Sequence, residues 1–216
     1  MPEGKDETPA AEVRYYWPNK MGRISLLALE DVMGRNGVNA VLNLAKLKHL
    51  VNNYPPNNLD LQFSFDEFSA IQQALEDMYG PRGGKGLALR QGRASFKYAL
   101  REFGAMLGMA DLAFRLLPLG MKVKVGLNAL AETFNKFTDH KVHIEEEADH
   151  FIWVIERCIV CWNRKCDAPC CHAAVGILQE AYHWVSGGKN CRIEEVTCIA
   201  MGDPTCNIVI GKKPFD

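Results

Sequence analysis

The sequence predicts an α+β fold in which N-terminal helices precede a hairpin–helix–hairpin unit, whose antiparallel sheet packs on the helices. Apolar residues recur at helical spacing through residues 15–139, and the pattern changes to strand-like alternation from His140 onward. We therefore expect a single ligand-binding domain over residues 15–216, with a mainly helical half at 15–139 and the hairpin unit at 140–216. Residues 1–14 are polar and contain two prolines, which predicts a flexible tail.

Glycine and a capping pattern divide the helical half. Helices are expected over 23–33 and 38–50, because Gly34 and Gly37 interrupt an otherwise continuous apolar stripe. Ser64 and Glu67 have the spacing of a capping box, which predicts a helix from there to about Tyr79.

The segment 80–86 (GPRGGKG) lacks the spacing of a phosphate-binding loop, so it is interpreted as a flexible connector. Longer helices are predicted over 87–107 and 119–137, with an apolar run at 112–117 before Pro118.

The second half alternates apolar and polar side chains. Residues 141–147 and 151–155 predict a first β-hairpin, and 172–185 an amphipathic helix that ends before Gly187. A second hairpin is expected from 191–200 and 206–210, around a Gly-Asp-Pro turn.

Charge and hydropathy exclude some classes of function. The chain has 25 basic and 26 acidic residues, so there is no electrostatic argument for binding nucleic acid or an anionic membrane. Its apolar stretches are far shorter than the ~20 residues of a membrane-spanning helix. The N-terminus has no apolar core typical of a secretory signal, and a cytoplasmic location is expected.

The cysteines carry the clearest chemical signal, since all eight fall between Cys158 and Cys206. In a chain without a secretory signal this favours metal ligation or reduced thiols over disulfides. Cys171, Glu195, Cys198 and Cys206 would make a tetrahedral zinc site. Glu195 and Cys198 would face opposite sides of a flat strand, so the site requires a bulge or a strand end. The alternative is that these cysteines are buried and pack as small hydrophobic residues.

A second possible thiol site consists of Cys158, Cys161, Cys166 and Cys170. The Cys-x-x-Cys spacing of the first two suits a zinc knuckle or a redox pair, and all four could hold an iron–sulfur cluster. The alternative is reduced thiols in an exposed connector.

The segment 171–210 (CHAAVG, then IEEVTCIAMGDPTCNIVI) resembles the end of 4-vinyl reductase domains, a hydrocarbon-binding family. It is also similar to the zinc-binding end of phenol-sensing bacterial activator domains. The resemblance implies zinc as cofactor, bound by Cys171, Glu195, Cys198 and Cys206. Because Cys170 adjoins Cys171, either could be the ligand.

The same resemblance implies a function in small-molecule binding or sensing. The ligand would be hydrophobic, aromatic or tetrapyrrole-like, and it would occupy a cavity between sheet and helices. Phe151, Trp153 and Ile155 alternate onto one strand face and form either a wall of this cavity or plain core. No catalytic constellation is visible, which favours a binding module over an enzyme.

Two alternatives to that function stay open. One is an accessory protein or enzyme in tetrapyrrole or bacteriochlorophyll vinyl reduction, and the other is a protein-interaction scaffold. The related domains tend to pair, so a homodimer built from the helices of the first half is expected.

Overall fold

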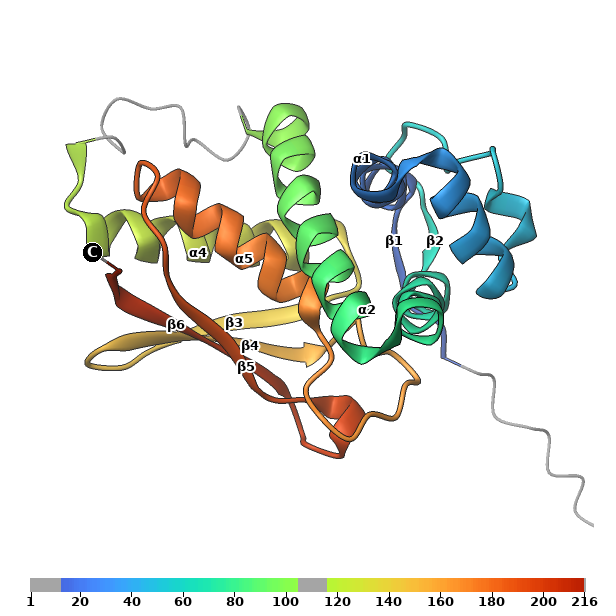
Figure 1. Ribbon diagram of the computed structural model, residues 1–216. Helices are drawn as coiled ribbons and strands as arrows, with labels where there is room; N and C mark the ends of the chain where they lie inside the picture. The colour runs from blue at the N-terminus through green and yellow to red at the C-terminus, as the bar shows by residue number, and fades with distance from the viewer. Residues whose placement is uncertain (1–12, 105–115, 216) are drawn as a thin grey trace, which may run out of the picture.

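The computed structural model describes residues 13–104 and 116–215 and confirms the α+β class (Figure 1). The predicted tail up to residue 12, and the parts of the 87–107 and 112–117 predictions within 105–115, lie outside the described residues. The helical half contains β1 (Tyr16–Pro18), α1 (Asn19–Leu44), η1 (Lys48–Leu50), β2 (Leu61–Ser64), α2 (Phe65–Phe103) and α4 (Leu119–Phe137). The second half contains β3 (Lys141–Glu146), β4 (His150–Arg157), α5 (His172–Val185), β5 (Cys191–Thr197), η2 (Ile199–Met201) and β6 (Cys206–Pro214).

The two predicted hairpins join into one antiparallel sheet of order β3-β4-β6-β5. The central pair β4–β6 places Trp153 opposite Ile208 and Ile155 opposite Cys206. Helices α4 and α5 cover one face of this sheet, and the second half of α2 packs along α5 (Figure 1). The hairpin–helix–hairpin prediction is therefore confirmed.

A second, two-stranded sheet pairs β1 with β2, with Trp17 opposite Phe63. The sequence does not predict this sheet, because strands of three and four residues are too short to show a period of two. Trp17 and Phe63 are both buried, so this small sheet anchors the start of α1 to the core.

Both long helices contain a glycine kink. Gly34 in α1 has φ +75° and Gly80 in α2 has φ +72°, which is left-handed backbone that favours glycine. The interpretation of residues 80–86 as a flexible connector is wrong, because the helix restarts at once after Gly80. Pro81 suits that first position, since its fixed φ is helical and no hydrogen bond is required of its nitrogen.

The predicted capping box at the start of α2 is confirmed. The Glu67 amide donates to Ser64 Oγ at 3.2 Å, and the Ser64 amide donates to Glu67 Oε2 at 2.7 Å. Within the described residues, no helix is long and apolar enough to cross a membrane.

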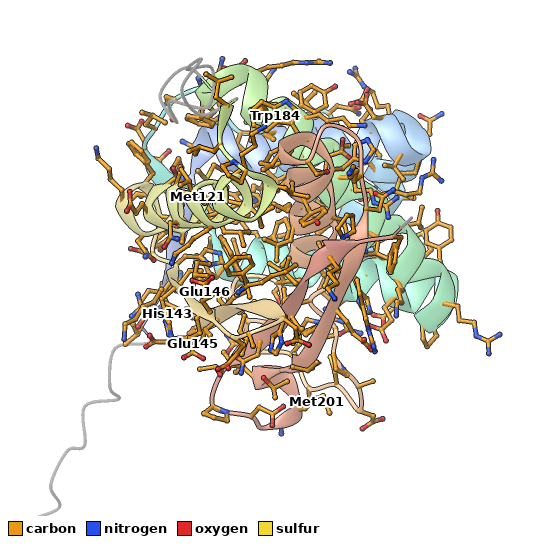
Figure 2. The ribbon with its side chains drawn as sticks, turned by 90° about the vertical axis from the view of Figure 1, so that its left-hand side faces the viewer. Met121, His143, Glu145, Glu146, Trp184 and Met201 are labelled. Carbon is orange, nitrogen blue, oxygen red and sulfur yellow. The ribbon has the colours of Figure 1, made fainter. Side chains whose placement is uncertain are left out.

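Polar side chains cover the outer edge of the sheet. His143, Glu145 and Glu146 of β3 are exposed, as expected for a solvated strand end. Figure 2 shows these residues on one side of the molecule, with Met201 of η2 at the end opposite Trp184 of α5.

Candidate functional site: an apolar cavity and a buried thiol cluster

An apolar cavity of about 70 Å³ lies where α1, α2, α4 and α5 meet. Its wall is almost wholly apolar and draws on both halves of the chain. Side chains that line it include Trp17, Ile24, Phe96, Leu130, Phe134 and Ile177. Because these residues come from β1, α1, α2, α4 and α5, the cavity exists only in the folded domain.

Two polar residues of this wall, Ser25 and Gln91, are bound to each other, and Gln91 is also bound to Gln72 behind it. Gln91 Nε2 donates to Ser25 Oγ at 2.9 Å, and Gln72 Nε2 donates to Gln91 Oε1 at 2.9 Å. All three residues are buried, so these bonds offset the cost of removing amides and a hydroxyl from water. The network leaves the cavity itself apolar.

A second cavity of about 30 Å³ adjoins the first and shares Trp17, Phe68, Phe134, Ala173 and Ile177 with it. Trp153 and Ile155, which the strand pattern predicts as either cavity wall or core, line this second space. Both are also buried core residues, so these two side chains are at once part of the core and part of the cavity wall. Phe151 is buried as well but is not among the residues that line this cavity.

His140 also lines the second cavity, and sequence reasoning missed it. Its ring is enclosed by Trp17, Phe65 and Phe134 at centroid distances of 5.6, 5.2 and 5.3 Å. Neither ring nitrogen has a hydrogen-bond partner among the described residues. Burial lowers the pKa of His140 to about 4, so the imidazole is neutral at physiological pH. A single histidine between a helix and a strand gives no pattern in the sequence.

The cysteines gather at the other end of the sheet, around the connector between β4 and α5. Cys158 and Cys161 lie in this connector, and Cys171 is the residue just before α5. Cys198 precedes η2 and Cys206 begins β6, with a turn between them that Gly202 permits at φ +101°. The Cys198 amide donates to Asp203 Oδ2 at 2.8 Å, which fixes this turn.

The sulfur atoms of this cluster lie close together. Cys171 Sγ is 3.5 Å from Cys158 Sγ and 3.8 Å from both Cys198 Sγ and Cys206 Sγ. Cys161 Sγ is 3.5 Å from Cys206 Sγ. All five of these side chains are buried, so Cys158 and Cys161 are not exposed thiols of the connector.

Glu195 joins the cluster through an irregularity in β5. The register between β5 and β6 shifts between Glu195 and Thr197, and Cys198 lies beyond the strand. This is the bulge and strand end that the sequence required for Glu195 and Cys198 to meet. Glu195 Oε2 accepts from the Cys171 amide at 2.7 Å, whereas Oε1 is buried with no partner among the described residues. Burial raises the pKa of this carboxyl to about 8, and the negative charge of Cys198 adds to the effect.

The thiols of the cluster affect one another's ionisation. Hydrogen bonds from neighbouring thiols, first of all that of Cys161, lower the pKa of Cys158 and of Cys198. Burial raises the pKa of Cys171. In the absence of a cation the cluster therefore holds few thiolates at once, because each anion raises the cost of the next.

Two predicted thiol residues lie apart from the closest grouping. Cys170 is buried with its Sγ 3.8 Å from Cys198 Sγ, but it belongs to neither set of four described next, and Cys166 is half-buried. Two sets of four residues each bring four potential ligand atoms within 4.8 Å of one another. The first set is Cys158, Cys161, Cys171 and Cys206. The second set is Cys171, Glu195, Cys198 and Cys206. The second set is the predicted metal site, and it contains Cys171 rather than Cys170.

Comparison with known protein structures identifies the fold of this chain. No protein-family model and no curated protein sequence matches the chain. Solved structures of H-NOX proteins do match over nearly the whole chain. An H-NOX protein from S. oneidensis in the Fe(II)NO ligation state is 14% identical, with a TM-score of 0.59 over 90% of this chain and 99% of that one.

Two further H-NOX structures agree. The Fe(II) unliganded H-NOX protein from K. algicida is 13% identical, with a TM-score of 0.56 over 92% of this chain and 97% of that one. A structure from work on heme distortion in the H-NOX family is also 13% identical, with a TM-score of 0.59 over the same shares. At this identity the comparison defines the fold, and this chain has the fold of H-NOX domains.

These findings correct two predictions. The resemblance to 4-vinyl reductase and phenol-sensing domains is wrong, because it rested on about forty residues whereas the H-NOX likeness spans nine tenths of the chain. The zinc cofactor implied by that resemblance is contradicted too, since the neighbouring structures are described with heme or ferrous iron. The spacing of cysteines on a hairpin depends only on local geometry, and several different folds can share that geometry. It therefore does not identify the family.

Proposed function

We propose that this chain is a binding or sensing domain for a small apolar molecule, which it holds in the cavity between α1, α2, α4 and α5. The observation that carries the proposal is the cavity itself: about 70 Å³ with an almost wholly apolar wall, next to a second space of about 30 Å³. Native cores are packed closely enough that such space is a feature to explain. The H-NOX fold of the chain is consistent with a sensory role.

The size of the cavity limits the ligand to a few heavy atoms. A water molecule needs roughly 10–15 Å³ of such space, and cavities of about 150 Å³ hold benzene or xenon. An apolar gas or a similarly small molecule therefore fits better than the larger aromatic or hydrocarbon ligands expected from the sequence. Binding would come from dispersion contacts with Phe96, Phe134 and Trp17, which line the space.

Heme is the group named for a neighbouring structure, but the described residues that line the two cavities do not fit it. A heme iron takes His, Cys, Met or Tyr as axial ligand. In the larger cavity the described wall offers only the thioether of Met21. His140 lines the smaller space, but aromatic rings enclose it. No arginine or lysine is among the described residues that line either cavity, so the heme carboxylates would lack a cationic partner.

Xenon is a suitable probe for the proposed site, because it binds apolar cavities without hydrogen bonds. We expect the ¹²⁹Xe resonance to shift and broaden with the unmutated protein at millimolar concentration. Ala99→Phe places a ring into the cavity and should abolish this effect while the domain stays folded. Val125→Phe, on the exposed face of α4, is the matched control and should leave the xenon effect unchanged. Equal xenon signals from Ala99→Phe and the unmutated protein would exclude this cavity as the site.

The remaining predictions about partners and location stay predictions. A homodimer would be detected by sedimentation equilibrium over a range of concentrations, and a monomer throughout would exclude it.

The two alternative functions predict different results. An enzyme in tetrapyrrole reduction predicts turnover with an added reductant, and an interaction scaffold predicts a stable complex with another protein. The cytoplasmic location is tested by fractionating cells that express the chain.

A further inference from the structure

The smaller cavity is bordered by buried polar atoms that the described protein atoms do not satisfy. His140 and Trp17 both line this space. Neither ring nitrogen of His140 has a hydrogen-bond partner among the described residues, and the same holds for Trp17 Nε1. A buried polar atom without a partner destabilises the folded state, and native proteins contain few of them. These nitrogens therefore indicate a partner that is not part of the protein chain.

The two residues are close enough to bind one small molecule together. Their ring centroids lie 5.6 Å apart. Trp17, Phe134 and Ile177 line both the smaller and the larger cavity, so the two spaces are adjacent. A molecule of a few heavy atoms whose polar end lies beside His140 therefore has its apolar part against these shared side chains.

The chemistry of the two rings limits what their partner can be. Burial lowers the pKa of His140 to about 4, so its imidazole is neutral at physiological pH and has one N–H donor and one acceptor nitrogen. Trp17 Nε1 only donates. A partner that satisfies both residues must accept a hydrogen bond from an N–H group and donate one to the acceptor nitrogen of His140.

A hydroxyl group does both with a single oxygen atom. A carbonyl or ether oxygen only accepts, and it would leave the acceptor nitrogen of His140 without a partner. An alkylamine is protonated at physiological pH, and a buried charge is costly unless it is paired. No acidic side chain is among the described residues that line this cavity. The hydroxyl group is therefore the polar group that fits the site.

Water can also accept and donate, and about 30 Å³ is enough for a water molecule. A buried water typically makes about three hydrogen bonds to polar groups. Apart from His140 and Trp17, the cavity is lined mostly by apolar side chains such as Val142, Ile155 and Leu178. An alcohol gains dispersion contacts with this wall through its alkyl group, so the wall favours an alcohol over water.

We propose that His140 determines the specificity of the ligand site, and that the ligand is a short-chain alcohol. Its hydroxyl group forms hydrogen bonds with His140 and Trp17 Nε1 in the smaller cavity, and its alkyl group lies in the larger cavity. The inference rests on the proposed function, because it adds one hydroxyl group to the small molecule that the domain holds. Binding involves hydrogen bonds and apolar contacts only, and no covalent bond changes.

Ethanol and propane are the probes for the test, because they are isosteric and differ by a hydroxyl group in place of a methyl group. Chemical-shift titration of the ¹⁵N-labelled full chain measures the binding of each probe. We expect saturable binding of both. The indole N–H resonance of Trp17 should move downfield with ethanol and not with propane, because only ethanol accepts a hydrogen bond from it.

Variants assign the hydroxyl contact to His140. His140→Leu removes both ring nitrogens and should lower the affinity for ethanol about tenfold, through the loss of its hydrogen bonds, without a comparable loss for propane. His140→Gln keeps a donor and an acceptor and should recover most of the ethanol affinity. His172→Leu is the matched control, because burial also lowers the pKa of His172 although it lines neither cavity. It should bind both probes like the unmutated protein.

The two probes distinguish a failure of this inference from a failure of the proposed function. Propane binding without ethanol binding, or an ethanol affinity that His140→Leu leaves unchanged, would overturn the inference alone. An unmutated protein that binds neither probe would overturn both. Circular dichroism establishes that each variant is folded. If His140→Leu does not fold, the Trp17 resonance of the unmutated protein decides, and equal shifts with ethanol and propane would overturn the inference.

Discussion

Gly92 of α2 and Gly176 of α5 each lie directly against the backbone of the other helix. A Cβ at Gly92 would stand 2.1 Å from the Ala173 carbonyl oxygen, and one at Gly176 would stand 2.2 Å from that of Leu89. Only glycine lets two helices approach so closely. The crossing holds α5 against α2 and so defines one wall of the cavity, to which Gly92 and Ala173 both belong.

Gly176→Ala should therefore destabilise the domain. The added methyl group meets backbone rather than a side chain that can move, so the helices must separate at a cost of about 1–3 kcal/mol or more. Urea unfolding followed by circular dichroism measures the change. Gly86→Ala is the control, since a Cβ at that position would have nothing within 4 Å, and it should stabilise by about 0.5–1 kcal/mol. Equal stabilities of the two variants would contradict the close crossing.

Ser64→Ala should lower the free energy of unfolding by about 1 kcal/mol, because it removes the side-chain acceptor for the Glu67 amide at the start of α2. Ser64→Asp keeps an acceptor at that position and should recover most of the loss. Thermal unfolding of the three proteins provides the measurement. An alanine variant as stable as the unmutated protein would show that the cap adds nothing in this context.

The buried His140 predicts a pH dependence of stability. Burial lowers its pKa to about 4, below the ordinary value of 6.5, with Arg157 acting in the same direction and Cys158 and Asp139 opposing it. Between these two values the unfolded chain binds more protons than the folded one, so stability falls as pH decreases from 6.5 to 4. The loss is on the order of 3 kcal/mol for this group.

His140→Phe removes the titrating group and keeps an aromatic ring, and the adjoining cavity has room for the larger side chain. As pH falls below about 6.5, the unmutated protein should lose unfolding free energy relative to the variant, and above that pH the difference between the two should be constant. This comparison separates His140 from His172, whose pKa burial also lowers to about 4. A difference that is constant from pH 7 to pH 4.5 would mean that His140 does not titrate as described.

The protein should bind no heme. Expression with a heme precursor should give protein without a Soret band, and titration with hemin should give no saturable one-to-one change. The S. oneidensis H-NOX protein, handled in parallel, is the positive control. A stoichiometric Soret band that His140→Phe abolishes would show instead that His140 serves as an axial ligand and that the aromatic rings around it move.

The sequence predicted the order of elements well where the local pattern is long. The hairpins, α5, α4 and the Ser64–Glu67 capping box all follow from periodicity or capping chemistry that acts within a few residues. The bulge beside Glu195 was also foreseen, because a strand alone cannot bring Glu195 and Cys198 together. Features of this kind depend on residues that are close together in the sequence, so the sequence alone predicts them.

What the sequence did not show depends on contacts between distant segments. The cavity is lined by residues from β1 to α5, and the enclosure of His140 needs Trp17, Phe65 and Phe134 in one place. The sharing of Cys171 and Cys206 between two sets of ligands likewise appears only when the connector folds onto β6. The spacing of Cys171, Glu195, Cys198 and Cys206 led to the wrong family resemblance for the same reason. That spacing describes one hairpin and one helix end, and not the contacts that define the whole fold.

Helix α5 belongs to both candidate sites within its first two turns. Cys171 at its start contacts the other sulfur atoms, while Ala173 and Ile177 line the cavity. A guest in the cavity that shifts α5 should also shift the Cys171 sulfur, and thermodynamic linkage makes any such effect reciprocal.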